Sequence, residues 1–128
     1  MLFSQQWESS WEDALARAKA EKKNILLVFS GSDWCIPCIK MEKAVWSSST
    51  FDAYAKSSLV TYRADFPKRK KNKLPESLQN EHNGLAEKYN PNGYFPWVVV
   101  LSSAQTPLDY FAYEKIPVAA YIKKLEKL

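Results

Sequence analysis

Both cysteines of the chain lie in one stretch, Ser30-Gly31-Ser32-Asp33-Trp34-Cys35-Ile36-Pro37-Cys38-Ile39-Lys40. Two thiols separated by two residues can close a small disulfide ring, and the thiolate is the form of cysteine that attacks a disulfide. A helix that begins at this pair would stabilise a thiolate on Cys35, because its first N–H groups are unpaired and its dipole is positive there. Cys35 is then the predicted nucleophile, and Cys38, one turn further in, is the predicted resolving thiol.

The residues on either side of this stretch support that geometry. Residues 25–29 form a continuous apolar run of strand length, which is typical of a central strand buried on both faces of a sheet. Residues 39–46 are good helix formers and end at the polar run 47–50. The order of strand, loop, cysteine and helix is the one that a stabilised thiolate requires.

The chain length and the numbers of cysteine and histidine residues favour a redox protein over a metal-binding protein. With 128 residues the chain is expected to form a single domain over residues 1–128 and to be a monomer. Two cysteines and one histidine, His82, are too few for a four-ligand zinc site, so we expect no metal and no cofactor. We place His82 on the surface of a polar helix. No apolar stretch is long enough to span a bilayer, so stable membrane insertion is not expected.

The net charge of +4 is concentrated in one run, where Lys68, Arg69, Lys70, Lys71 and Lys73 lie close together. Such a run could bind nucleic acid or an acidic lipid surface. No stacking aromatics or glycine-rich pattern accompany it, so we expect a solvated loop and no nucleic-acid partner. A gel shift lost when these residues are neutralised would favour the alternative.

The rest of the chain reads as alternating helices and strands. Helical spacing of apolar residues predicts helices over 7–23 and 76–89, a short helical piece near 51–55, and a last helix from 118. Runs rich in β-formers predict strands over 59–65, 94–101 and 108–113, the last two antiparallel because only a short turn joins them. The expected fold is α/β, with a central mixed four-stranded sheet covered by helices on both faces.

Two motifs resemble the thioredoxin superfamily. Trp34-Cys35-Ile36-Pro37-Cys38 after an apolar strand resembles its active site, and Phe95-Pro96 before a strand resembles its cis-proline. The resemblance covers nearly the whole chain and is strongest to the DsbH-like group of secreted bacterial thiol-disulfide oxidoreductases.

That resemblance implies a thioredoxin-like fold and a reductase or isomerase of protein disulfides. It also implies that Trp34, Phe95 and Pro96 bind an extended substrate, with Trp97 as a further candidate. Export to the periplasm and an upstream electron donor, such as a membrane reductase of the DsbD type, are implied in the same way. The first residues lack the basic and apolar regions of a signal peptide, so the alternatives are a cytoplasmic protein or a chain whose signal was removed.

Several positions depart from the family pattern. The family has a buried acid six residues before the first cysteine, and this chain has Phe29 at that position; the lysine that pairs with this acid in the family corresponds to a position near Thr61. The family has a proline five residues after the first cysteine, where this chain has Lys40. Water, Asp33 or Glu42 must then accept the proton of the resolving thiol, and the sequence does not choose among them. Asp33 could equally be a loop cap.

The residues between the cysteines are expected to tune the redox potential. A histidine there would favour an oxidising protein by stabilising the Cys35 thiolate, and Ile36-Pro37 supplies none. This favours a reductase or isomerase.

A binding module is the alternative from another class. The cysteines could hold copper(I), which prefers soft thiolates, or form a merely structural disulfide. A third soft ligand would have to be Met41, which lies on the next helical turn. A titration of the reduced protein with copper would separate this alternative from an oxidoreductase.

Overall fold

The computed structural model describes residues 7–128, and its centre is a four-stranded sheet in the order β2-β1-β3-β4. The strands are β1 Asn24–Ser30, β2 Leu59–Asp65, β3 Trp97–Leu101 and β4 Pro107–Phe111. β1 pairs parallel with β2 and antiparallel with β3, and β3 pairs antiparallel with β4. The predicted mixed sheet, with an antiparallel last pair, is confirmed.

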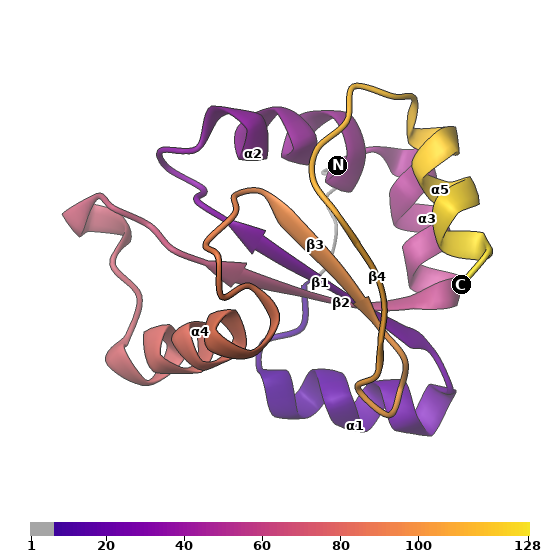
Figure 1. Cartoon of the computed structure of the whole chain (residues 1–128), viewed down its shortest axis with the longest axis horizontal. Helices are drawn as coiled ribbons and strands as arrows, with labels where there is room; N and C mark the ends of the chain where they lie inside the picture. The colour runs from indigo at the N-terminus through magenta and orange to yellow at the C-terminus, as the bar shows by residue number, and fades with distance from the viewer. Residues whose placement is uncertain (1–6) are drawn as a thin grey trace.

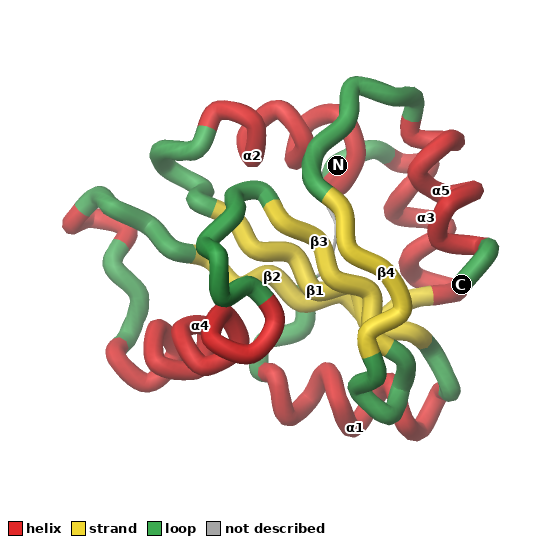
Figure 2. Tube along the Cα trace, viewed as in Figure 1, coloured by secondary structure: helices red, strands yellow, loops and turns green. Residues whose placement is uncertain are grey.

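Helices cover both faces of the sheet, as Figures 1 and 2 show. α1 Trp11–Glu21 and α4 Glu76–Tyr89 pack on one face. The other face carries α2 Ile36–Met41, a π-helix Glu42–Trp46 (η1), α3 Ser49–Ser58 and α5 Val118–Glu126. A 3₁₀ turn, Lys70–Asn72 (η2), interrupts the basic loop between β2 and α4.

Each face of β1 contributes to a separate apolar core. Leu26 and Val28 join the core under α3 and α5, whereas Ile25, Leu27 and Phe29 join the core under α1 and α4. All of these side chains are buried because successive residues of a strand point to opposite faces of the sheet. The continuous apolar run therefore marks a strand covered on both sides, as predicted.

Some predicted element ends differ from the structure. α1 begins at Trp11 after its N-cap Ser10, whose side chain accepts the N–H of Asp13, so Trp7 lies before the helix. The strand predicted from residue 94 begins only at Trp97. The short helical piece near residues 51–55 is the full helix α3, with Ser48 as its N-cap. Propensity identifies the elements, whereas local capping decides where each one starts.

The expectation that His82 lies on the surface is wrong, since only 3% of this residue is exposed. α4 packs against β2 and brings the ring to the end of that strand. The Asp65 N–H donates to Nδ1 over 3.1 Å, and Nε2 lies 3.1 Å from the Tyr62 hydroxyl. Burial lowers the pKa of His82, since it disfavours the charged ring more than nearby acids favour it.

No helix within residues 7–128 has the length and apolar character needed to cross a membrane.

Candidate active site

The cysteine pair lies where β1 passes into α2, at the edge of the sheet. Cys35 and Cys38 form a disulfide with their Cα atoms 5.2 Å apart. Cys35 is the N-cap of α2, and the Cys38 N–H donates to Cys35 Sγ over 3.3 Å. Both cysteines are buried in this oxidised form, while Ile36 between them is 62% exposed. The predicted helix start at the pair is confirmed, and a backbone N–H points at the Cys35 sulfur.

Trp34 is held in place by the loops around it. Its indole N–H donates to the Phe66 carbonyl over 2.7 Å, and its ring meets Phe95 edge-on with centroids 5.4 Å apart. Gly31 lies directly beneath the indole, so that a Cβ at this position would collide with the ring. The loop before the cysteines thus depends on a glycine for close packing rather than for an unusual backbone angle.

Asp33 anchors the basic loop to the cysteine loop. Its carboxylate accepts the backbone N–H groups of Lys68 and Arg69, each over 2.9 Å, and the side-chain amide of Asn72 over 3.0 Å. These hydrogen bonds, that of Asn72 first, lower the pKa of Asp33 to about 2. The same anchoring leaves Lys68 Nζ 4.0 Å from the centroid of the Trp34 ring. Of the two roles considered for Asp33, the geometry is that of a loop cap.

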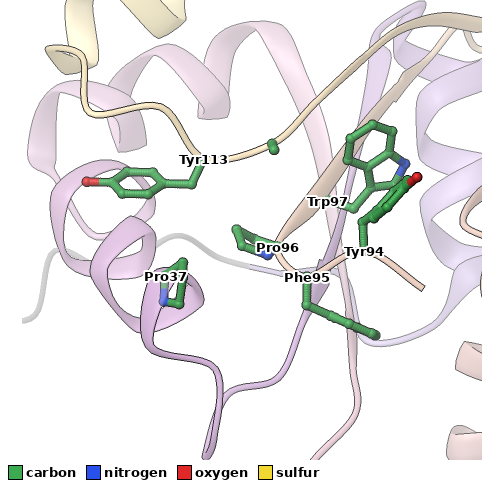
Figure 3. Close-up of a pocket in the computed structure, with 7 residues that line it drawn as sticks. Pro37, Tyr94, Phe95, Pro96, Trp97 and Tyr113 are labelled. Carbon is green, nitrogen blue, oxygen red and sulfur yellow. The ribbon is translucent and has the colours of Figure 1, made fainter. Parts of the chain in front are cut away.

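An apolar groove of about 640 Å³ includes Pro37, the residue before Cys38, in its lining (Figure 3). It is lined by Pro37, Tyr94, Phe95, Pro96, Trp97, Ala112 and Tyr113. The Phe95–Pro96 peptide bond is cis, as the resemblance to the thioredoxin superfamily implies. Of the residues proposed to contact substrate, Phe95 and Pro96 line the groove, whereas Trp34 lies outside it behind Phe95.

Sequence reasoning missed two aromatic residues of this groove. Tyr94 is 52% exposed and its ring lies 5.2 Å from that of Trp97. The aromatic run around Phe95 was a usable signal for it. Tyr113 follows β4, and nothing in the sequence brings it near the cysteines.

None of the positions that depart from the family pattern places a buried charge near the cysteines. Phe29 is fully buried and stacks on Phe66, with ring centroids 6.4 Å apart, so no charge lies there. Thr61 is also buried, and Lys40 is exposed on α2. Met41, the third ligand considered for copper, packs in the core with Val28. Over residues 7–128 no group of three His, Cys, Asp or Glu side chains could hold a metal ion.

A cysteine pair at a helix start, with Pro37 between the two cysteines lining the same groove as a cis-proline, is the arrangement of a thioredoxin-like protein. The chain belongs to the thioredoxin-like family, whose family model matches residues 6–103. It is a thiol-disulfide oxidoreductase of that family.

Its relatives include two Dsb proteins of Chlamydia pneumoniae. The disulfide bond reductase DsbH is 36% identical over 121 residues, which cover 94% of this chain and 70% of DsbH. A solved structure of a DsbH oxidoreductase matches with a TM-score of 0.89 and 34% identity, over 97% of this chain and 83% of that one. The thioredoxin-related protein DsbJ is 28% identical over 75% of this chain, but the match covers only 27% of DsbJ.

Proposed function

We propose that the chain reduces disulfide bonds of protein substrates, with Cys35 as the attacking thiol and Cys38 as the resolving thiol. The observation that carries this proposal is the N-cap position of Cys35, whose sulfur accepts the Cys38 N–H over 3.3 Å. A sulfur so placed is favoured as a thiolate once the disulfide is reduced. The reductase named DsbH, at 36% identity, supports the same direction of exchange.

The reaction moves two electrons from the protein to the substrate. The Cys35 thiolate attacks one sulfur of the substrate disulfide, forms a mixed disulfide and releases the other substrate sulfur as a thiolate. Cys38 then loses its proton and attacks Cys35 Sγ, which closes the Cys35–Cys38 disulfide and releases the second substrate sulfur. Two protons end on the two substrate thiols. A thiol donor must reduce the protein before the next cycle.

The apolar groove is where an extended substrate segment would lie. Pro37, Phe95 and Pro96 line it together with Tyr94 and Tyr113. Its aromatic walls suit the apolar side chains of an unfolded or extended protein, whose backbone can pair beside Pro96. This places no demand on the substrate's sequence.

Ile36 and Pro37 influence the reduction potential of the cysteine pair because neither carries a charge. Both side chains are exposed and neither is charged, so the Cys35 thiolate gains no stabilisation from them. A less stabilised thiolate leaves the disulfide form relatively favoured, which makes the dithiol the better reductant.

The Dsb relatives support a proposal about the cellular setting. We propose the periplasm or another exported location, with a membrane reductase of the DsbD type as electron donor and disulfide-containing proteins as substrates. A disulfide reductase in an oxidising compartment needs such a donor because the disulfide form would otherwise accumulate.

The reduction potential of the Cys35/Cys38 pair, together with insulin reduction, tests the proposal. A potential near the thioredoxin value of about −270 mV and rapid insulin reduction are expected. The Cys38→Ser variant should accumulate the mixed disulfide, whereas Cys35→Ser should form none. Pro37→His is the matched tuning variant and should raise the potential. A wild-type potential near the DsbA value of about −120 mV with poor insulin reduction would refute the reductase direction.

A further inference from the structure

A smaller cavity of about 220 Å³ includes Cys38 in its lining. It is lined by Ser30, Ser32, Cys38, Ile39, Glu42, Lys43 and Arg63. A cavity of this size has room for several water molecules, and its lining offers them polar partners. The resolving cysteine and a carboxyl side chain therefore share one polar cavity.

One carboxylate oxygen of Glu42, which lines this cavity, lacks a hydrogen-bond donor among the described residues. Its Oε1 lies 3.3 Å from Arg63 Nη1, whereas its Oε2 is buried and has no hydrogen-bond partner within residues 7–128. Buried polar atoms of this kind commonly bind ordered water. Desolvation raises the pKa of Glu42, although the charge of Arg63 works in the opposite direction. The carboxyl can thus exchange a proton closer to neutral pH than an exposed glutamate can.

The other acid considered for this task is already engaged. Asp33 accepts three hydrogen bonds from the basic loop, and its pKa of about 2 leaves it ionised near neutral pH. It does not line the cavity that Cys38 shares with Glu42. The position where the family carries its buried acid is the apolar Phe29.

We propose that Glu42 accepts the proton of the Cys38 thiol through water in this cavity while Cys38 attacks the mixed disulfide. This rests on the proposed reductase function. The Cys38 S–H bond breaks, its proton passes through water to the Glu42 carboxylate, and the Cys38 thiolate forms the S–S bond with Cys35. The second substrate sulfur leaves as a thiolate with the electron pair of the broken bond. The proton on Glu42 then passes to solvent or to that leaving thiolate, which restores the carboxylate.

The surrounding charges fit this assignment. Arg63 from β2 and Lys43 from η1 line the cavity, and the charge of Arg63 favours the carboxylate that must receive the proton. Asp65 at the end of β2 is engaged with Ser32, whose N–H donates to it over 3.0 Å, so it does not compete for the cavity water.

The test separates the two thiol steps in a stopped-flow reaction of the reduced protein with one equivalent of 5,5′-dithiobis(2-nitrobenzoate). The first thionitrobenzoate released reports attack by Cys35, and the second reports attack by Cys38. Cys38→Ser marks the first step alone. Glu42→Gln should leave the first step unchanged and slow the second at least tenfold at pH 7, toward the range of general base catalysis of about 10²–10⁴. The difference should vanish at alkaline pH, where hydroxide removes the thiol proton, and Glu42→Asp should restore part of the rate.

Two matched variants control for the loss of any carboxyl. Asp52 on α3 is also a buried acid with an unpartnered oxygen, but it does not line this cavity. Asp52→Asn and Asp33→Asn should both leave the second step at the wild-type rate. Slowing by Asp33→Asn in place of Glu42→Gln would overturn the proposal.

Arg63→Gln provides an independent readout if Glu42→Gln does not fold. Arg63 opposes the raised pKa of Glu42, so its removal should shift the rise in the rate of the second step to higher pH. A purely structural role would not cause this shift. An unchanged pH–rate profile for Arg63→Gln, or a Glu42→Gln rate of the second step equal to wild type, refutes the role of Glu42 and leaves the reductase function standing. A wild-type protein that releases no thionitrobenzoate and leaves insulin unreduced refutes the reductase function itself.

Discussion

Replacing His82 by alanine should lower the free energy of unfolding of the oxidised protein by about 2–4 kcal/mol. The Tyr62 O–H donates to Glu81, so the Tyr62 oxygen accepts from His82 Nε2–H in the tautomer whose Nδ1 accepts the Asp65 N–H. The Asp65 carbonyl oxygen also lies 3.0 Å from Nδ1. The substitution leaves the part-buried Asp65 N–H without this acceptor, which costs at most about 1–3 kcal/mol. The lost ring contacts with Tyr62 and Phe66 account for the rest.

His82→Phe separates the two contributions. It keeps the volume of the ring and removes both nitrogen atoms, so only the hydrogen-bond part of the loss, about 1–3 kcal/mol, should remain. Chemical denaturation of the oxidised proteins at pH 7.5 measures both values. Equal losses for alanine and phenylalanine would show that packing contributes little at this position.

The same histidine predicts a pH dependence of stability. Burial lowers the pKa of His82 in the folded protein, so below the ordinary value of 6.5 the unfolded chain binds a proton that the folded chain does not. The free energy of unfolding should therefore fall as the pH drops below about 6.5, by up to about 1.4 kcal/mol per pH unit. His82 is the only histidine of the chain, so no other imidazole contributes.

Denaturation of wild type and His82→Phe at several pH values between 5 and 7.5 checks this slope. Glu42, with its raised pKa, stabilises the fold at low pH and loses that contribution as the pH rises, which is the opposite sign. The comparison is therefore made between Glu42→Gln and the double variant Glu42→Gln/His82→Phe. If the double variant keeps the pH slope of Glu42→Gln, the buried neutral ring of His82 is not the source of that slope.

Three further substitutions test the core, a helix cap and the loop before the cysteines. Leu27→Ala removes a fully buried side chain of β1 and should destabilise the oxidised protein by about 2–5 kcal/mol, measured by denaturant unfolding. Ser48→Ala removes the oxygen that accepts the Phe51 N–H over 3.1 Å at the start of α3 and should cost about 1 kcal/mol in the same assay; no change would mean that water replaces the cap. Gly31→Ala forces the Trp34 indole from its place, so its fluorescence should shift and insulin reduction should slow; an unchanged emission spectrum would contradict the packing described.

Much of the fold could be read from local pattern. Residues 25–29 and 59–65 have the apolar, β-branched character of buried strands, and the structure forms β1 and β2 there. The helix over 76–89 was predicted with the ends that the structure has. Local pattern is less informative about the ends of other elements, since the cap at Ser10 and the start of β3 at Trp97 depend on hydrogen bonds and pairing made on folding.

The chemistry of this protein can be read from local sequence, because two cysteines at this spacing after a buried strand place one sulfur at a helix start. The polar side chains that surround this chemistry are set by tertiary packing. Asp33 caps a loop 35 residues further along the chain, and His82 binds a strand residue 17 positions before it. Hydrophobic periodicity reports which residues face the core, but it carries no information on polar partners brought together from different elements. For that reason Asp33 and Glu42 are equivalent acids in the sequence, and only the folded chain places Glu42 in a cavity with Cys38.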